Sequence, residues 1–319
     1  MYKSFYNLER SPFELTPDPS FLFPTSRHNE ALAALYHGVR GHKGFVVLTG
    51  EVGTGKTLLL RCLLQLLSRT SDIACAYTFN SHLAPLEFLQ QIASDFGLAV
   101  SGKKKSEVLS SLGNYVIERG SRLLTTVLVV DEAHQLSVDA LEEIRLLTNL
   151  ETTQDKLLQV LLVGQPELDD KLDSANLRQL KQRIAHRCQL LPLDLNETVG
   201  YIERRLQVAG LGPQNRILFP FETIAGIYRH THGIPRLINT VCENALITAY
   251  AQQKQNVTPE IVAAVVADLR LNCNAAHSSE MEKTAKLDEA NLRQAAKGLL
   301  DLLAYLNKLP SGDNELRTQ

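Results

Sequence analysis

One short segment of the sequence has the residue types and spacing of a phosphate-binding loop. Residues 50–57 read Gly-Glu-Val-Gly-Thr-Gly-Lys-Thr and match the pattern GxxxxGKS/T in full. The glycines let the backbone fold around an anion, so that successive N–H groups and the start of the next helix point at it. Lys56 would reach the β- and γ-phosphates of a nucleotide, and the Thr57 hydroxyl would ligate Mg²⁺. The residues that we expect to bind the nucleotide are Gly50, Glu51, Val52, Gly53, Thr54, Gly55, Lys56 and Thr57.

Two acidic residues follow an apolar run further along the chain. Residues 127–130 are Val-Leu-Val-Val, and Asp131 and Glu132 come next. In sheets of parallel strands, ligands bind at the carboxyl ends of the strands. Asp131 would hold Mg²⁺ through water, and Glu132 would polarise the water that attacks the γ-phosphate. Either acid alone could cap a following helix, but the pair after an apolar strand, in a chain with a phosphate-binding loop, favours the catalytic interpretation.

Gln165 and Asn80 also follow strand-like runs, so both would face the same edge of the sheet. Gln165 would contact the γ-phosphate or the attacking water, and Asn80 would hold Glu132 in an inactive rotamer. For each, an ordinary hydrogen bond at the end of a strand is the alternative. His134 completes the letters Asp-Glu-Ala-His, which resemble a helicase motif, but the chain has no room for a second core of equal size. No role for His134 follows from the sequence.

Basic residues in two further segments could bind the phosphates of a nucleotide. Arg178, Lys181, Arg183 and Arg187 are interspersed with apolar residues in one segment, and Arg236 follows Gly-Ile-Pro at the start of a predicted helix. A cation near the γ-phosphate stabilises the charge of the transition state and can come from a neighbouring subunit. For Arg178 and Lys181, a solvated basic helix face is the alternative.

The segments that must position these residues alternate between helix and strand. Their apolar patterns predict strands over residues 45–48, 73–79, 126–130 and 157–163. They predict helices over residues 29–39, 58–67, 86–96, 106–120 and 138–150. Strands that are apolar on both faces and alternate with helices form a parallel sheet covered by helices on both faces. Residues 196–270 have helical patterns only, which predicts a small all-helical second domain.

The two ends of the chain have patterns of their own. Residues 11–24 are rich in Pro and Phe, which predicts an extended segment packed on the body of the protein. Residues 272–279 are polar and predict a linker. Residues 292–306 then carry apolar side chains at the spacing of an amphipathic helix. Such a helix would dock on the protein's own core, or bind a partner or a second copy.

The composition limits the class of protein. The chain has 319 residues and is 44% hydrophobic and 21% charged, which predicts a folded globular protein long enough for two domains. The 33 Lys and Arg against 35 Asp and Glu argue against wholesale wrapping of nucleic acid and leave a local basic patch open. Five scattered cysteines predict neither a disulfide framework nor a zinc site. Without a secretory signal pattern or an apolar span, we expect a cytoplasmic protein that meets the inner membrane only through partners.

Several sequence motifs together resemble those of the AAA+ ATPases. They are the loop at 50–57, the run Val-Leu-Val-Val-Asp-Glu-Ala-His, the strand end Gly164-Gln165, the box Gln182-Arg183-Ile184 and Gly-Ile-Pro-Arg at 233–236. Within this class the chain is similar to the general secretion pathway protein A (ExeA-like) family, and most similar to its shorter MSHA pilus-biogenesis (MshM-like) form. Pro12-Phe13 and Gly164-Gln165-Pro166-Glu167-Leu168 are phrases typical of the family, and the resemblance covers residues 1–270.

The resemblance implies a domain organisation. An AAA+ P-loop core would cover residues 1–194, in which residues 1–44 form a segment and a helix on the adenine side of the nucleotide. A helical lid would follow over residues 195–270. A linker and an amphipathic helix would complete the chain over residues 271–319.

The resemblance also implies roles for the candidate residues. ATP and Mg²⁺ would bind in the cleft, with Gln165 as sensor 1 and Arg236 as sensor 2 in the same subunit. Arg183 is the arginine that we expect to reach the ATP of a neighbouring subunit, and Arg187 is the alternative. The expected catalytic residues are thus Glu132, Lys56, Arg183, Gln165 and Asn80, and the expected metal ligands are Thr57 and Asp131.

These roles lead to a hypothesis about function. The chain would be an ATP-hydrolysing assembly factor for a type IV pilus or type II secretion apparatus, acting as a homo-oligomeric ring or filament with secretion or pilus assembly proteins. Longer relatives continue into a transmembrane helix and a peptidoglycan-binding part, which we do not expect here. The same core resembles the transposition regulators of the TnsC and MuB kind, so an ATP-dependent DNA-binding regulator with residues 103–105 facing DNA is the alternative. A third hypothesis is a nucleotide-gated scaffold that barely hydrolyses ATP. The intact Asp131-Glu132 pair argues against it.

Overall fold

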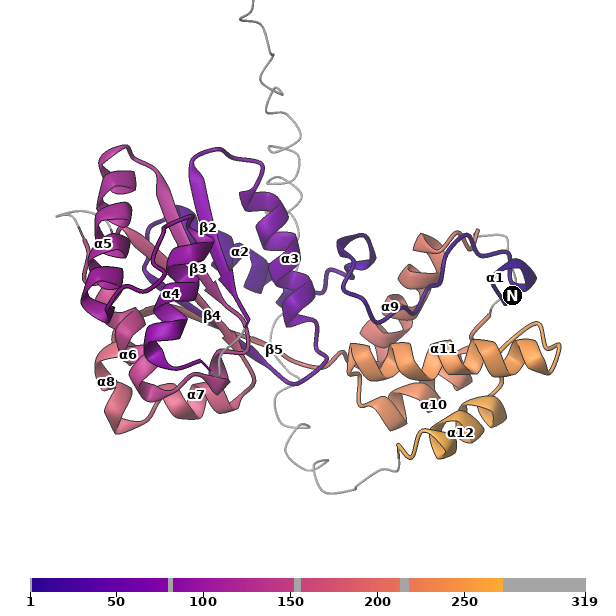
Figure 1. Cartoon of the computed structure of the whole chain (residues 1–319). Coiled ribbons are helices and arrows are strands. Elements are labelled where there is room, and N and C mark those ends of the chain that lie inside the picture. The colour runs from indigo at the N-terminus through magenta and orange to yellow at the C-terminus, as the bar shows by residue number, and fades with distance from the viewer. Residues whose placement is uncertain (1, 80–82, 152–155, 213–217, 272–319) are drawn as a thin grey trace, which may run out of the picture.

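The protein folds into an α/β unit built on one sheet and a second unit made of helices (Figure 1). The structure, a computed structural model, describes residues 2–79, 83–151, 156–212 and 218–271. Asn80 and the helix predicted over residues 292–306 lie outside this part of the chain.

The sheet has five parallel strands in the order β2-β3-β4-β1-β5. The strands are β1 (Phe45–Gly50), β2 (Ile73–Thr78), β3 (Thr125–Val130), β4 (Leu158–Gly164) and β5 (Ile184–Leu190). β1, β3 and β4 are buried at every position because they lie inside the sheet and helices cover both of its faces. This double burial is why their sequences are nearly continuous runs of apolar residues.

Two layers of helices cover the sheet. On one face, α2 (Ser26–Arg40) and α3 (Lys56–Leu67) bury residues such as Leu35 and Leu63 against alternate positions of the central strands. The opposite face is covered by α4 (Pro85–Asp95), α5 (Lys105–Ser121), α6 (Val138–Leu147), α7 (Glu167–Leu172) and α8 (Arg178–Lys181). Three short 3₁₀ helices are η1 (Pro19–Phe21), η2 (Ala133–Gln135) and η3 (Ala175–Leu177). The predicted α/β fold is confirmed.

The sequence does not predict β5, the edge strand that pairs with β1. Along β5, half-buried residues alternate with the exposed residues Ala185, Arg187 and Gln189. One side of an edge strand faces solvent, so β5 lacks the apolar run that marks the central strands. Arg187 therefore lies on the sheet, whereas Arg178 and Lys181 belong to the short helix α8 and are exposed.

The helical unit has an apolar core of its own, which includes Ile202, Ile227, Val241, Leu246 and Val265. Its helices are α9 (Leu195–Val208), α10 (Phe221–Thr231), α11 (Pro235–Ala251) and α12 (Pro259–Asp268), and the short N-terminal helix α1 (Tyr2–Phe5) packs on them. The boundaries that we expect at residues 194 and 270 stay predictions.

The N-terminal segment, residues 1–44, which we expect on the adenine side of the nucleotide, contacts both units in the structure. The structure divides this segment: α2 lies on the sheet, whereas Tyr6, Leu8 and Phe13 are part of the apolar core of the helical unit. In Figure 1 the indigo N-terminal trace runs along α9 toward α11. The physical reason is that both faces of the sheet are already covered by helices, so the apolar side chains of the segment are buried against the helical unit instead.

A buried arginine fixes the N-terminal segment on the helical unit. Arg205 of α9 is 5% exposed. Its Nη1 donates hydrogen bonds to the carbonyl oxygens of Pro12 at 2.7 Å and Glu14 at 3.3 Å, and its Nε donates to the Tyr201 hydroxyl at 2.8 Å. The guanidinium also lies 4.8 Å from the centroid of the Phe21 ring. Hydrogen bonds from a charged donor contribute about 1.5–3 kcal/mol each, so these contacts hold the segment firmly.

Replacing this arginine should release the segment. We expect Arg205→Ala to lower the free energy of unfolding by about 3 kcal/mol, because two carbonyl groups and a hydroxyl lose a charged donor. Urea denaturation measures this change, and limited proteolysis should show faster cleavage within residues 10–22. Arg204→Ala replaces the exposed neighbouring arginine and should stay within about 0.5 kcal/mol of the parent. Equal stability of the two variants would contradict this role of Arg205.

Candidate active site

The phosphate-binding loop joins the end of β1 to the start of α3, as its pattern requires. Gly53 and Gly55 have φ angles of 85° and 103°, in the left-handed region that favours glycine. A Cβ atom on Gly53 would lie 2.7 Å from the Cβ atom of Arg236, so a larger residue there would force the helical unit to move. The loop therefore has a backbone that depends on its glycines and lies in contact with both units.

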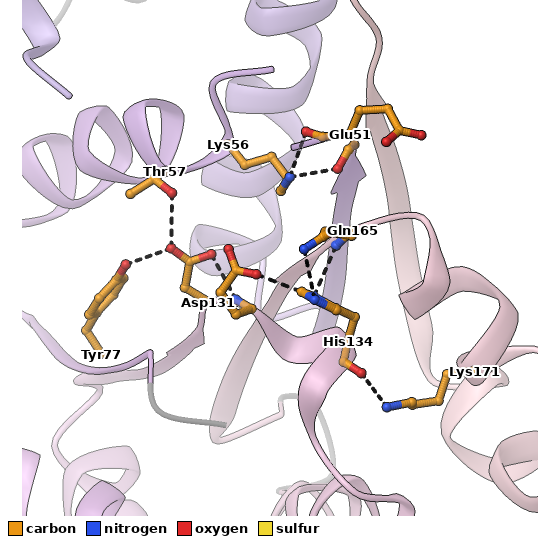
Figure 2. A network of polar contacts seen from close by, with 10 residues as sticks. Glu51, Lys56, Thr57, Tyr77, Asp131, His134, Gln165 and Lys171 are labelled. Carbon is orange, nitrogen blue, oxygen red and sulfur yellow. Dashed lines mark hydrogen bonds and ion pairs between the residues drawn. The ribbon is translucent and has the colours of Figure 1, made fainter. Parts of the chain in front are cut away.

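Lys56 is a buried cation at this loop. It is the first residue of α3 and is 6% exposed. Its Nζ donates hydrogen bonds to the carbonyl oxygens of Gly50 at 2.7 Å and Glu51 at 3.0 Å (Figure 2). Burial lowers the pKa of Lys56, and the negative charges of Glu132 and Asp131 act in the opposite direction. An anionic phosphate bound here would compensate for the burial of the ammonium group.

Thr57 and Asp131 lie side by side although they belong to different elements. The Thr57 hydroxyl at the start of α3 donates a hydrogen bond to Oδ2 of Asp131, after β3, at 3.3 Å. Hydroxyl and carboxylate oxygens suit Mg²⁺, which commonly takes one or two protein ligands and completes its shell with water and substrate phosphates. Among the described residues no cluster of three or more His, Cys, Asp or Glu could hold a metal ion. The hydroxyl and the carboxylate of the Thr57–Asp131 pair fit Mg²⁺ that arrives with a nucleotide, because they supply two oxygen ligands at one point.

Tyr77 of β2 also contacts Asp131, and the sequence does not predict it as a site residue. Its hydroxyl donates to the same Oδ2 at 2.9 Å, while the backbone N–H of Glu132 donates to Oδ1 at 3.0 Å (Figure 2). Burial, and after it the charge of Asp131, raises the pKa of Tyr77, so the hydroxyl keeps its proton. The sequence could have indicated Tyr77 only by its position near the end of a predicted strand. Its closeness to Asp131 depends on the pairing of Tyr77 with Val129, which only the fold provides.

His28 of α2 is a second residue near the loop that the sequence does not predict. It is 7% exposed, and its Nδ1 lies 2.7 Å from Oγ1 of Thr25, the residue that caps α2. A Cβ atom on Gly55 would lie 3.5 Å from Nε2 of His28, so the imidazole packs directly under the loop. Burial lowers the pKa of His28, which favours a neutral ring in this supporting position.

His134 lies beside both Glu132 and Gln165, and Figure 2 shows its imidazole against Gln165. Glu132 has a φ angle of 55°, which is uncommon for a residue other than glycine. Its Oε2 lies 3.6 Å from Nδ1 of His134. Gln165 follows β4, and its backbone nitrogen and its side-chain nitrogen both face the same imidazole. The sequence predicts Glu132 and Gln165 at this edge of the sheet, but not that His134 lies between them.

Arg236 approaches the loop from the helical unit. Its backbone N–H at the start of α11 donates to the carbonyl oxygen of Gly53 at 3.2 Å. Nearby, the N–H of Leu193 donates to the carbonyl oxygen of Gly233 at 2.9 Å. The first bond holds the start of α11 against the loop of the same subunit, and the second joins the turn before α11 to the segment between β5 and α9. Arg236 is exposed there.

Arg183 lies at the opposite edge of the sheet from the loop. It directly precedes β5, whose first residue Ile184 pairs with Phe45 at the start of β1. Its Nη1 donates to the carbonyl oxygen of Arg145 and to the hydroxyl of Thr148, both at 3.2 Å. The structure therefore does not bring Arg183 to the loop of its own subunit. This agrees with the resemblance, which implies that Arg183 reaches the ATP of a neighbouring subunit.

Arg187, the alternative to Arg183, is engaged elsewhere in its own subunit. Arg187 forms ion pairs with Asp169 at 3.3 Å and with Asp173 at 3.0 Å. Asn80 follows β2 and lies outside the described residues, so its relation to Glu132 stays a prediction.

Comparisons with known proteins bear on the class of this site. A family model described as an AAA domain matches residues 39–172. The general secretion pathway protein A of Aeromonas hydrophila is 42% identical over 258 residues, which cover 81% of this chain and 46% of that protein. The chain thus spans just under half the length of this curated relative.

Solved structures share the fold at low sequence identity. One is the Aeropyrum pernix ORC2 protein in its ADPNP and ADP complexes, with 19% identity over 82% of this chain and 72% of that chain and a TM-score of 0.60. A second is Drosophila ORC bound to DNA, with 18% identity over 97% and 80% and a TM-score of 0.63. A third is Cdc6p of Pyrobaculum aerophilum, with 20% identity over 83% and 70% and a TM-score of 0.59. At these identities the likeness shows the fold alone.

The matched AAA domain, the fold and the phosphate-binding loop together make this chain an AAA+ ATPase. Its 42% identity to the curated relative extends over most of the chain. Within the AAA+ class, the chain is ExeA-like, because this relative is a general secretion pathway protein A. Among the described residues, no helix is both long enough and apolar enough to cross a membrane.

The hydrogen bond from Tyr77 to Asp131 gives a testable prediction. Tyr77→Phe removes one hydroxyl and keeps the ring, so Asp131 should be held less firmly toward the metal. We expect the Mg²⁺ concentration at half-maximal binding of a fluorescent ATP analogue to rise about tenfold, while binding in EDTA stays that of the parent. Tyr36→Phe is the control, because Tyr36 packs near Arg40 instead. An unchanged Mg²⁺ midpoint in Tyr77→Phe would contradict a positioning role.

Proposed function

We propose that this ATPase binds ATP with Mg²⁺ over the loop at residues 50–57 and hydrolyses it at this edge of the sheet. The observation that carries the proposal is the convergence of Lys56, Thr57 and Asp131, which supplies a cation, a hydroxyl and a carboxylate at one point. Thr57 and Asp131 would hold Mg²⁺, which supplies a Lewis acid to the phosphate oxygens when it is bound. Glu132, next to Asp131 and 37% exposed at its side chain, would polarise the attacking water.

The other residues of the chain would bind and orient the substrate. The N–H groups of the loop and Lys56 would hold the phosphate oxygens and balance their charge. Gln165 would bind a γ-phosphate oxygen or orient the water from the end of β4. Arg236 would approach the phosphates from the helical unit, whose backbone already contacts the loop at Gly53. Closure of this unit over the nucleotide would exclude bulk water from the reaction.

We also propose that the active form is a homo-oligomer, either a ring or a filament. Arg183 lies at the amino-terminal edge of the sheet, away from its own loop, and a cation at that edge is suited to serve the ATP of a neighbouring subunit. ATP bound between two subunits would then join them, and hydrolysis would loosen the contact.

The biological role that we propose is assembly or remodelling of a type IV pilus or type II secretion apparatus at the cytoplasmic face of the inner membrane. The support is the identity with a protein named general secretion pathway protein A. Because the chain spans less than half of that relative, its partners and its closeness to the shorter MshM-like form belong to the proposal as well.

The contacts of the three lysines at residues 103–105 do not favour the alternative of a DNA-binding regulator. Lys103 donates a hydrogen bond to the hydroxyl of Ser111 at 3.2 Å, and Lys105 forms an ion pair with Glu143 at 2.5 Å. The carboxylate of Glu143 offsets the charge of Lys105, and the hydrogen bond to Ser111 directs the Lys103 side chain toward its own subunit, so these contacts give no support for a phosphate-binding surface.

Two substitutions separate binding from hydrolysis. Lys56→Ala should abolish ATP binding, because the loop loses its cation. Glu132→Gln should bind ATP like the parent and lose turnover by about 100-fold or more, because the base is gone. Equilibrium binding and a phosphate-release assay measure the two properties. Glu118→Gln, on an exposed pair with Arg122, is the control, and normal turnover in Glu132→Gln would contradict the proposed base.

A mixing experiment tests whether Arg183 acts on a neighbouring subunit. We expect Arg183→Ala to bind ATP and lose turnover by about 1,000-fold or more. Mixed with Glu132→Gln, it should regain turnover, because its intact sites can then receive Arg183 from the other variant. Arg187→Ala tests the alternative and should keep its turnover. A failure to regain turnover on mixing would reject action across subunits.

A further inference from the structure

His28 is a buried histidine of α2 that lies against the phosphate-binding loop. It is 7% exposed and belongs to the first turn of α2, whose capping residue is Thr25. Its Nε2 faces the loop, because a Cβ atom on Gly55 would lie 3.5 Å from it. The nitrogens of a buried imidazole need hydrogen-bond partners, and these partners determine which nitrogen has the proton.

The contact with the loop places the proton on Nε2. Burial lowers the pKa of His28, and a hydrogen bond with the backbone of Thr54 acts in the opposite direction. A hydrogen bond raises the pKa of a base when the base donates it. The N–H of Thr54 is itself a donor, to the carbonyl oxygen of Glu51 at 3.3 Å. The carbonyl oxygen of Thr54 is therefore the acceptor, and Nε2, the nitrogen beside Gly55, is the donor.

Thr25 matches this tautomer at the other ring nitrogen. Its Oγ1 accepts a hydrogen bond from the backbone N–H of His28 at 3.2 Å and lies 2.7 Å from Nδ1 of the same residue. A neutral imidazole with its proton on Nε2 accepts at Nδ1, so the Thr25 hydroxyl donates there. The imidazole is thus held by the cap of α2 on one side and by the loop on the other.

The hydrogen bond from Nε2 sets the orientation of one peptide group of the loop. A peptide group is planar and trans, so its C=O and N–H point in opposite directions. With the Thr54 carbonyl directed at His28, the N–H of Gly55 points away from α2. Gly55 has a φ angle of 103°. Because glycine adopts positive and negative φ alike, the backbone of the loop does not enforce this orientation by itself.

We propose that His28 is a positioning residue that orients the Thr54–Gly55 peptide group, so that the N–H of Gly55 is presented to the phosphates of an incoming nucleotide. A peptide group that turned over would present its carbonyl oxygen to the anion and repel it. The bond from Nε2 keeps the donor in place before the nucleotide arrives, so little reorganisation is needed on binding. The inference rests on the proposed binding of ATP at the loop.

Selective NMR labelling of the full chain observes this peptide group directly. Only two peptide bonds in the sequence join Thr to Gly, Thr49–Gly50 and Thr54–Gly55, so carbonyl-¹³C threonine with ¹⁵N glycine gives two signals. Without nucleotide, the Thr54 carbonyl signal should move in His28→Leu, which lacks the donor, while the Thr49 signal stays in place. His28→Gln, whose amide nitrogen can take the position of Nε2, should keep the signal of the parent. In the parent, ADP should move the N–H proton signal of Gly55 downfield.

Equilibrium binding in EDTA gives a second readout that a merely structural role would not move. His28→Leu should bind ADP about tenfold more weakly, because one N–H of the loop is no longer held toward the phosphates, and should bind adenosine like the parent. His28→Gln should regain most of the affinity for ADP. His37→Leu is the control, because His37 is an exposed histidine of the same helix, and it should bind both ligands like the parent.

An unchanged Thr54 carbonyl signal in His28→Leu, or parent-like affinity of this variant for ADP, would overturn the inference and leave the proposed function standing. Equal losses of affinity for ADP and adenosine would also overturn it, since they would show a general disturbance of α2. His28→Asn, which reaches only the position of Nδ1, provides the same comparisons if His28→Leu does not fold. A parent chain that binds neither ADP nor ATP would instead reject the proposed function itself.

Discussion

The active site depends on one constraint, which is that parallel strands bring their carboxyl ends to a single edge of the sheet. β3, β4 and β1 are neighbours in the sheet. The loop, the Asp131-Glu132 pair and Gln165 follow the ends of these three strands, so they must lie next to one another. The hydrogen-bonded ladder is rigid and fully buried, and it therefore fixes the relative positions of groups that loops alone would leave variable.

The same arrangement buries two charged side chains at the ends of the strands. Lys56 and Asp131 are 6% and 4% exposed, and an ion so far from water needs partners close by. Backbone carbonyl groups of the loop satisfy the ammonium group, while the hydroxyls of Thr57 and Tyr77 satisfy the carboxylate. These contacts keep the side chains in place for an incoming triphosphate, so that little reorganisation is needed when it binds.

The helical unit is linked to this edge through backbone contacts and through the N-terminal segment. The N–H of Arg236 reaches the loop at Gly53, and Arg205 holds the segment that leads to α2. The sequence identifies the helices of this unit from their periodicity. It does not show that residues near Phe13 belong to its core, because Pro- and Phe-rich sequence predicts an extended chain without saying which surface it covers.

The sequence by itself determined the parts whose signal is local: the loop at residues 50–57, the acids after an apolar run, and central strands whose two faces are both buried. The tertiary structure decided the rest, including β5, the hydrogen bond from Tyr77 to Asp131, and the place of His134 between Glu132 and Gln165. An edge strand with one solvent-exposed face lacks the continuous apolar run by which the central strands are predicted. Contacts across neighbouring strands depend on sheet order and register, which the pattern of one segment does not contain.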